Sequence, residues 1–205
     1  MPDQKMEQSV NLTTPKMGLY SLILAAGSAD RFGAPKQLAR YQGQSLVRRM
    51  LHLARQTTGA RSVLVVGAEW QRVVEECRTE VPFIVRNERY ETGMASSIAC
   101  GIRAIKPVSD AVLILLADQP LITIDHLSSL QDAWLASPAS IVATEFDGIS
   151  GPPVIFPADY LDALLTLRGD RGARSIIKDN ENTVVKIAFE DAAIDVDTPE
   201  DLERL

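Results

Sequence analysis

The chain has few cysteines and no long apolar segment, and these absences exclude several classes of protein. Its 205 residues include only Cys77 and Cys100, without Cys-x-x-Cys spacing, so neither a zinc site nor a disulfide framework is predicted. No apolar run approaches the ~20 residues that span a bilayer. The N-terminus also lacks the apolar core of a signal peptide. We therefore expect a cytoplasmic protein with no membrane partner.

Concentrated positive charge is lacking as well. The chain has 21 Lys and Arg against 27 Asp and Glu, a formal net charge of −6, and no block of basic residues. Because nucleic-acid surfaces need clustered positive charge, no nucleic-acid partner is expected. Aromatic residues make up only 5% of the chain, but 46% of it is hydrophobic, which is ample for a packed core.

The most informative stretch runs from Leu19 to Lys36. The apolar run Leu19–Ala25 is typical of a buried parallel strand, and Gly27 closes it. The loop that follows carries two cations, Arg31 and Lys36, and glycines that let a ligand approach the backbone closely, which favours a phosphate-binding loop. Its spacing matches neither the Walker A loop nor Gly-x-Gly-x-x-Gly. The alternative is an ordinary strand-to-helix loop with surface cations.

Predicted strands alternate with helices along the rest of the chain. Strands are expected over 62–66, 81–85, 111–117, 141–144 and 194–196. Residues 148–156 are expected to be a turn that runs into a short extended segment, and 183–188 an extended stretch. Helices are expected over 45–54, 69–78, 123–135 and 159–167, from Ser96 or Ser97, and from Thr198. This alternation predicts an open, mostly parallel, three-layer α/β fold. We expect residues 1–17 to be a disordered leader and residues 18–205 to form one domain.

Carboxylates lie at two notable places. Asp118 follows the most hydrophobic run, and the carboxyl ends of parallel strands are where open α/β sheets bind ligands. A carboxylate beside a triphosphate suits Mg²⁺, which binds few carboxylates plus substrate phosphates. The alternative is a turn or helix-capping aspartate. Near the C-terminus, Asp195 and Asp197 would share one face of a strand, which capping by Thr198 does not explain.

Five elements in this order resemble the nucleotidyltransferases related to molybdenum-cofactor guanylyl- and cytidylyltransferases. They are Leu24-Ala25-Ala26-Gly27 with Arg31, Gly33 and Lys36; Asn87 with Gly93-Met94-x-x-Ser97; Asp118; Gly169-Asp170-x-Gly172-Ala173-Arg174; and Asp195-x-Asp197-Thr198-Pro199-Glu200-Asp201-Leu202. The resemblance covers nearly the whole chain after Met17. The double alanine resembles the cytidylyl branch, since the guanylyl branch typically has Leu-Ala-Gly-Gly. Ala29 departs from the pattern, because a serine is common there.

The resemblance implies a Rossmann-like fold of the glycosyltransferase-A type and a role for each matched residue. The implied catalytic residues are Arg31, Lys36 and Asp118. The implied nucleotide-binding residues are Leu24, Ala25, Ala26, Gly27, Arg31, Lys36, Gly67, Asn87, Gly93, Ser96 and Ser97. The implied acceptor-binding residues, within an elaboration over 139–188, are Gly151, Pro152, Gly169, Asp170, Gly172, Ala173 and Arg174. Mg²⁺ would be held by Asp118, Asp197 and Asp195.

The implied reaction is transfer of CMP from CTP to the phosphate of a molybdopterin cofactor, with release of pyrophosphate. A phosphate acceptor, with a second pKa of about 6, needs no general base, and the sequence offers none of note. The reaction needs charge neutralisation and in-line positioning, for which Lys36 and Arg31 are suited.

Other functions remain open. A sugar- or polyol-phosphate nucleotidyltransferase would have a similar fold and metal site. The chain would also suit a chaperone without turnover that hands the cofactor to a molybdenum hydroxylase of purine catabolism, and a molybdoenzyme or its chaperone is a further expected partner. No dinucleotide fingerprint supports hydride transfer.

Overall fold

The computed structural model describes residues 18–28, 32–80, 83–170 and 172–205. The expected leader 1–17, Arg31 and the first two residues of the expected strand 81–85 therefore lie outside the described residues. The strands are β1 (Leu19–Ala25), β2 (Arg40–Tyr41), β3 (Gln44–Ser45), β4 (Ser62–Val66), β5 (Phe83–Arg86), β6 (Ala111–Leu116), β7 (Val142–Phe146), β8 (Ile149–Pro157) and β9 (Val185–Ala188).

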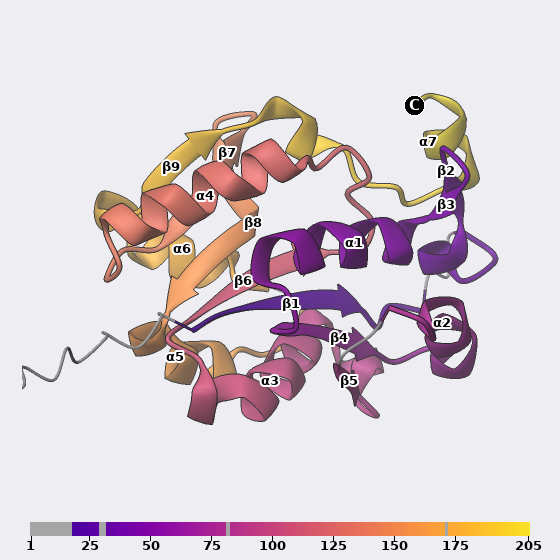
Figure 1. The fold of residues 1–205 in the computed structure, drawn as a ribbon, viewed down its shortest axis with the longest axis horizontal. Coiled ribbons are helices and arrows are strands. Elements are labelled where there is room, and N and C mark those ends of the chain that lie inside the picture. The colour runs from indigo at the N-terminus through magenta and orange to yellow at the C-terminus, as the bar shows by residue number, and fades with distance from the viewer. Residues whose placement is uncertain (1–17, 29–31, 81–82, 171) are drawn as a thin grey trace, which may run out of the picture.

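Seven of these strands form one sheet, in the order β5-β4-β1-β6-β8-β7-β9, within the described part of the chain (Figure 1). β1 pairs in parallel with β4 and β6, β4 with β5, and β7 with β9. β8 runs antiparallel to both of its neighbours, β6 and β7. The predicted mostly parallel sheet is therefore confirmed, and the antiparallel strand falls in the segment that breaks the strict alternation of strands and helices.

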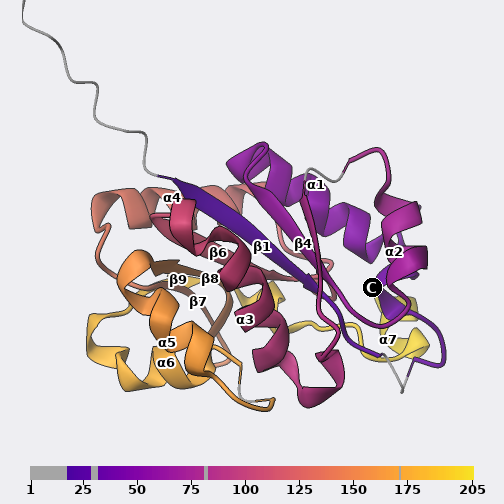
Figure 2. The ribbon, with the colours of Figure 1, turned by 90° about the horizontal axis from the view of Figure 1, so that it is seen from below.

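Helices cover both faces of the sheet (Figures 1 and 2). The α-helices are α1 (Leu46–Thr58), α2 (Trp70–Cys77), α3 (Met94–Ile105), α4 (Ile124–Ala136), α5 (Leu161–Thr166), α6 (Arg174–Asp179) and α7 (Pro199–Glu203). α1, α2 and α4 contribute to one buried hydrophobic cluster, and α3, α5 and α6 contribute to the other. The predicted three layers are thus confirmed. No helix in the described ranges is long and apolar enough to cross a membrane.

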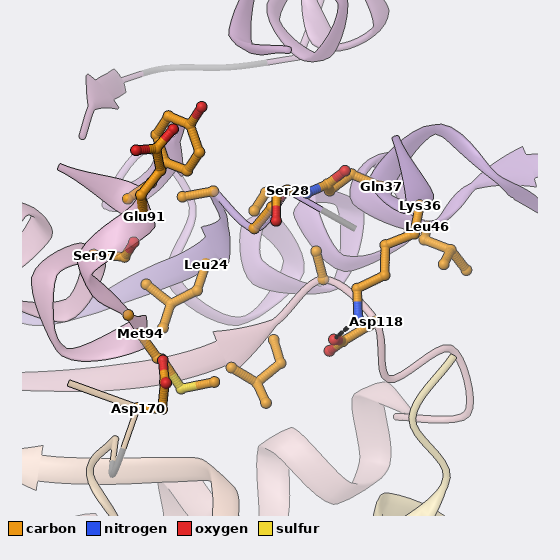
Figure 3. Close-up of a pocket in the computed structure, with 17 residues that line it drawn as sticks. Leu24, Ser28, Lys36, Gln37, Leu46, Glu91, Met94, Ser97, Asp118 and Asp170 are labelled. Atoms are coloured by element: carbon orange, nitrogen blue, oxygen red, sulfur yellow. Dashed lines mark hydrogen bonds and ion pairs between the residues drawn. The ribbon is translucent and has the colours of Figure 1, made fainter. Parts of the chain in front are cut away.

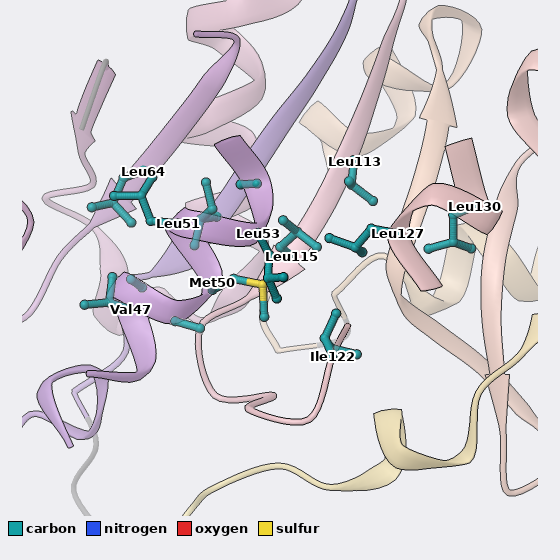
Figure 4. Close-up of a cluster of buried hydrophobic side chains, with 14 of the residues drawn as sticks. Val47, Met50, Leu51, Leu53, Leu64, Leu113, Leu115, Ile122, Leu127 and Leu130 are labelled. Carbon is teal, nitrogen blue, oxygen red and sulfur yellow. The ribbon is translucent and has the colours of Figure 1, made fainter. Parts of the chain in front are cut away.

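The core is built mainly from aliphatic side chains. Figure 4 shows the cluster beneath α1 and α4, where Met50 and Leu51 of α1 lie near Leu115 of β6. All three side chains are at most 1% exposed. Burying a side chain of this size contributes roughly 1.5–3 kcal/mol, so many Leu, Ile and Val residues stabilise the sheet despite the low aromatic content.

Two expectations about local structure are wrong. The helix expected from Ser96 or Ser97 begins at Met94. Gly93 precedes it with φ +101°, a conformation that favours glycine, and the Ala95 amide donates to the Gly169 carbonyl, so the chain enters the helix earlier. The second error is the strand expected over 194–196, which has no regular structure because it docks by a single backbone hydrogen bond instead of pairing in a ladder.

One buried histidine makes the stability of the fold depend on pH. His126 of α4 is 5% exposed and stacks on Phe189, with 4.4 Å between ring centroids. Its Nε2 lies 2.8 Å from Thr144 Oγ1, and that hydroxyl donates to the Pro153 carbonyl. The histidine is therefore the hydrogen-bond donor to Thr144. Burial lowers the pKa of His126 to about 4 from 6.5.

We expect the free energy of unfolding to fall by about 2 kcal/mol between pH 7 and pH 5 because of His126. In this window the unfolded chain binds a proton at His126 and the folded chain does not, so acid favours unfolding. Urea titrations at the two pH values should show that His126→Gln removes the contribution of His126, so that the variant loses less stability in acid than the unaltered chain. His52→Gln, a change at an exposed histidine, is the matched control. An equal pH dependence in His126→Gln and the unaltered chain would contradict the assignment.

Candidate active site

A pocket of about 320 Å³ opens at the carboxyl ends of β1 and β6. Figure 3 shows its two ends: Lys36 and Asp118 lie at one end, whereas Glu91, Ser97, Met94 and Asp170 lie at the other. The backbone from Leu24 to Gly27 lines the space between them. The predicted first loop and the predicted acidic strand end therefore face the same cavity.

Lys36 joins two carboxylates that are far apart in the sequence. Its Nζ lies 2.7 Å from Asp118 Oδ2 and 2.9 Å from Asp197 Oδ1. Asp118 follows β6, and Asp197 precedes α7. Lys36 begins a short 3-10 helix that the extended residue Pro35 precedes, which directs the lysine from the loop towards both acids. The structure thus brings together one predicted catalytic cation and two predicted metal ligands.

Hydrogen bonds hold the C-terminal segment against β6. The Val196 amide donates to the Asp118 carbonyl at 2.9 Å, and the Val196 side chain is fully buried. The Asp201 carboxylate accepts from the amides of Asp197, at 3.0 Å, and Thr198, at 2.8 Å. These backbone hydrogen bonds hold the pKa of Asp201 below its usual value. The capping box of α7 therefore also fixes the backbone of Asp197.

The charges in this cluster influence one another. Burial alone would lower the pKa of Lys36, but attraction and hydrogen bonding to Asp118 and Asp197 outweigh it, so the pKa is raised. Lys36 is therefore a cation at neutral pH. Asp195 keeps an exposed surface, yet desolvation of its carboxyl group, followed by the charge of Asp118, raises its pKa to about 6.

The Asp118–Asp197 pair has the chemistry of a divalent-cation site. Asp118 Oδ1 is buried and has no hydrogen-bond partner among the described residues, which leaves an anionic oxygen for a cation. Within the described ranges, no group of three or more His, Cys, Asp or Glu side chains is arranged to hold a metal ion. Asp195 therefore does not complete a three-carboxylate site as predicted. Two carboxylates suffice for Mg²⁺ when substrate phosphates supply further oxygens.

The sequence interpretation missed Gln37, which supports the first loop. Gln37 is 3% exposed, and its Nε2 donates to the Gly27 carbonyl at 2.7 Å. This bond joins the two ends of the loop that carries Arg31, a residue outside the described ones. The only signal in the sequence was the position of Gln37 directly after Lys36. A single glutamine beside a charged residue usually lies in solvent, so burial was not expected.

Gly67 supports the pocket without lining it. A Cβ at this glycine would lie 2.6 Å from the Ala26 carbonyl oxygen and 2.9 Å from the Ala26 Cβ. The Ala68 amide also donates to the Ala26 carbonyl. Gly67 therefore allows β4 to approach the first loop closely, and its contact with nucleotide stays a prediction.

Asn87 and Ser96 likewise support the pocket without lining it. The Asn87 side-chain amide donates to Ser96 Oγ at 2.8 Å and to Ser97 Oγ at 3.0 Å. Its Oδ1 accepts from the Arg89 amide at 3.0 Å. With its polar atoms used in this way, Asn87 positions the start of α3. Of these three predicted nucleotide-binding residues, Ser97 lines the pocket.

Part of the predicted acceptor loop lies at the pocket that the first loop lines. Asp170 lines that pocket together with Met94 and Glu91, which the sequence interpretation did not assign. A Cβ at Gly93 would lie 2.4 Å from Asp170 Oδ1 and 2.7 Å from the Gly169 carbonyl oxygen, so these loops touch. A Cβ at Gly172 would lie 3.2 Å from Met94 Sδ, so these two residues are also close. Ala173 is buried in the core.

A separate depression of about 350 Å³ lies beside the start of β8 and α6. Arg174 lines it, and a Cβ at Gly151 would lie 3.4 Å from Arg174 Nε. Pro152 belongs to β8, and its carbonyl accepts from Gln119 Nε2 at 3.3 Å. The predicted acceptor set is therefore divided: Asp170 lies at the pocket that the first loop lines, and Arg174 lies at the second depression.

Several solved structures have the same architecture as this chain. The rv0371c homolog of Mycobacterium sp. strain JC1 matches with TM-score 0.77 and 26% identity, covering 91% of this chain and 93% of that one. Rv0371C of Mycobacterium tuberculosis, in complex with manganese, gives 0.74 and 22%, covering 92% and 98%. Molybdopterin-guanine dinucleotide biosynthesis protein A of Archaeoglobus fulgidus gives 0.65 and 19%, covering 90% and 95%. The last two identities show the fold alone.

The chain belongs to the family described as the MobA-like NTP transferase domain, whose model matches residues 21–184. It is 28% identical over 201 residues to the purine catabolism protein PucB of Bacillus subtilis, covering 91% of this chain and 95% of that protein. It is 29% identical over 195 residues to the nicotine blue oxidoreductase of Paenarthrobacter nicotinovorans, covering 90% and 94%. The predicted family is therefore confirmed.

Proposed function

We propose that this chain is a Mg²⁺-dependent nucleotidyltransferase that transfers CMP from CTP to the phosphate of a molybdopterin cofactor and releases pyrophosphate. The observation that carries the proposal is Lys36 held between Asp118 and Asp197 at one end of a pocket lined by the first loop. A cation and two carboxylates at the end of a nucleotide-sized pocket are suited to a triphosphate and its metal ion.

The proposed step exchanges one phosphorus–oxygen bond for another. An oxygen of the acceptor phosphate forms a bond to the α-phosphorus of CTP as the bond between that phosphorus and the bridging oxygen breaks, and pyrophosphate leaves with the electron pair. Lys36 would stabilise charge on the α-phosphate and the leaving group, as would Arg31. Bound Mg²⁺ would neutralise the phosphates, and Asp118 and Asp197 would hold it. Manganese in the complex of Rv0371C is consistent with a divalent cation in this fold.

The acceptor would approach from the side of Arg174. Arg174 lines the second depression. Desolvation and the charge of Asp118 raise the pKa of Asp195, whereas the positive charge of Arg174 lowers that pKa. An arginine can bind a phosphate with two parallel hydrogen bonds. The molybdopterin would thus lie over β8 and α6, with its phosphate directed towards Lys36.

Pyrophosphate release, measured with each of four nucleoside triphosphates, tests this function. Release that requires both CTP and molybdopterin supports the proposal. Release with a sugar or polyol phosphate in place of molybdopterin would support the alternative transferase. Binding of molybdopterin with no pyrophosphate release from any triphosphate would support the chaperone alternative for a molybdenum hydroxylase, to which the name of PucB also points.

CTP is expected to be preferred over GTP because of Ala26. This residue lines the pocket, and its methyl group packs towards Gly67 on the α3 side of the sheet. A methyl group that narrows a site typically changes selectivity by about 1–3 kcal/mol, or tenfold to a couple of hundredfold. Competition assays should therefore show that Ala26→Gly loses discrimination and keeps most CTP turnover.

The matched control is Ala25→Gly, because Ala25 also lines the pocket but its methyl group packs on the other, α1 side of the sheet. This variant should keep the CTP preference. If the unaltered protein uses GTP or ATP as well as CTP, the cytidylyl assignment fails and the broader nucleotidyltransferase assignment stands.

A further inference from the structure

A third hollow, of about 530 Å³, lies on the α3 side of the sheet, apart from the candidate active-site pocket and the second depression. Four arginines line it. Arg86 comes from β5, Arg89 from the turn that follows, Arg103 from α3 and Arg168 from the loop after α5. Glu88 is the one acidic residue among its described lining residues. This concentration of positive charge contrasts with the net charge of −6 for the whole chain. We call this hollow the arginine pocket.

Internal contacts hold two of the arginines in place. The Arg86 guanidinium lies 4.9 Å from the Trp70 ring centroid and pairs with Glu88 at 3.8 Å. Arg168 donates to the carbonyls of Thr166 at 3.1 Å and Leu167 at 2.8 Å, at the C-terminal end of α5. Both guanidiniums are therefore positioned before any ligand binds, which lowers the entropic cost of binding.

The other two arginines leave their charges uncompensated. The guanidiniums of Arg89 and Arg103 have no hydrogen-bond or ion-pair partner in the part of the chain that the structure describes. Both residues are exposed. Bringing several like charges to one hollow costs free energy, which an anion would offset. Guanidinium groups bind phosphate oxygens with paired, charge-assisted hydrogen bonds.

We propose that the arginine pocket binds a compact phosphate-bearing small molecule. Its volume lies within the roughly 300–1,000 Å³ of small-molecule sites. The site is separate from the candidate active site, since α3 lies between them. Ser96 lines the arginine pocket and Ser97 lines the active-site pocket, and Asn87 donates to both hydroxyls. The proposal does not depend on the reaction assigned above.

Cys100 provides a local reporter for this site. It lines the arginine pocket and is partly exposed, whereas Cys77 is fully buried and serves as an internal control. Inorganic pyrophosphate would be titrated while the alkylation rate of each thiol is measured by mass spectrometry, with EDTA present to remove metal ions. Occupancy should slow Cys100 alkylation at least about tenfold at saturation, because the ligand covers the thiol and neutralises Arg103.

Variants separate the proposed site from general charge effects. The double change Arg89→Ser with Arg103→Ser should abolish the protection. Arg78→Ser removes an exposed arginine at the C-terminal end of α2, outside the arginine pocket, and should leave the protection unchanged. Inorganic phosphate and a phosphorylated sugar, tested in the same way, distinguish sources of the phosphate group. Equal protection by chloride at matched ionic strength, full protection in the double variant, or no protection by any phosphate compound would overturn the proposal.

Discussion

Replacing Lys36 with alanine is expected to lower turnover by at least roughly a hundredfold. Lys36 is the cation that the described residues place between Asp118 and Asp197, and its side chain is 16% exposed. A preorganised charge in such a partly buried site stabilises developing negative charge more than it would in water. Steady-state kinetics with the preferred triphosphate and acceptor would measure the loss.

A second measurement separates catalysis from folding. Lys36 and a divalent cation compete for the same two carboxylates, so Lys36→Ala should bind Mn²⁺ more tightly than the unaltered protein in the absence of nucleotide. Electron paramagnetic resonance would report this affinity, and thermal unfolding would report the fold. Lys106→Ala is the matched control, since Lys106 pairs with Asp162 on the surface. Unchanged turnover in a folded Lys36→Ala protein would contradict the proposed role of Lys36.

Replacing Asp118 with asparagine is expected to remove most divalent-cation binding and to lower turnover by roughly a hundredfold to a thousandfold. Asp118 offers a buried oxygen, Oδ1, without a hydrogen-bond partner among the described residues, and a second oxygen bonded to Lys36. Asparagine has nearly the same shape and no charge, so it keeps the packing and loses the attraction for a cation. Titration with Mn²⁺ in the presence of CTP would measure the change.

Asp162→Asn supplies the control for the Asp118 change, because it removes one carboxylate from the exposed pair with Lys106. Its cation affinity and turnover should equal those of the unaltered protein. If Asp118→Asn kept Mn²⁺ affinity in the ternary mixture, the metal site would have to lie elsewhere, and Asp118 would serve only to orient Lys36.

Much of the sheet could be predicted from the sequence alone. The boundaries of β1 and β4 agree with the predicted runs, because strands buried on both faces are continuous apolar segments closed by small or polar residues. Asp118 was predictable for a related reason: an acid directly after the most buried strand must lie at the edge of the sheet. The order of the five matched elements then identified the family, which the family comparison confirms.

The tertiary structure decided the contacts by which distant residues meet. The resemblance implies that Asp118 and Asp197 share a metal ion, but nothing in the sequence indicates that Val196 docks on the Asp118 carbonyl or that Lys36 bonds to both acids. The two Lys36 contacts join segments 82 and 161 residues apart. The two expectations that failed, the strand over 194–196 and the later start of α3, depended on such long-range contacts.

The same limit applies to Asp170 and to the arginine pocket. Asp170 reaches the candidate active-site pocket because Gly93 has no side chain and lets the two loops touch. Arg89, Arg103 and Arg168 come from separate segments. No local run of basic residues therefore predicts that they line one pocket. Local periodicity determines which residues form a strand or a helix, whereas the packing of those elements decides which side chains share a site.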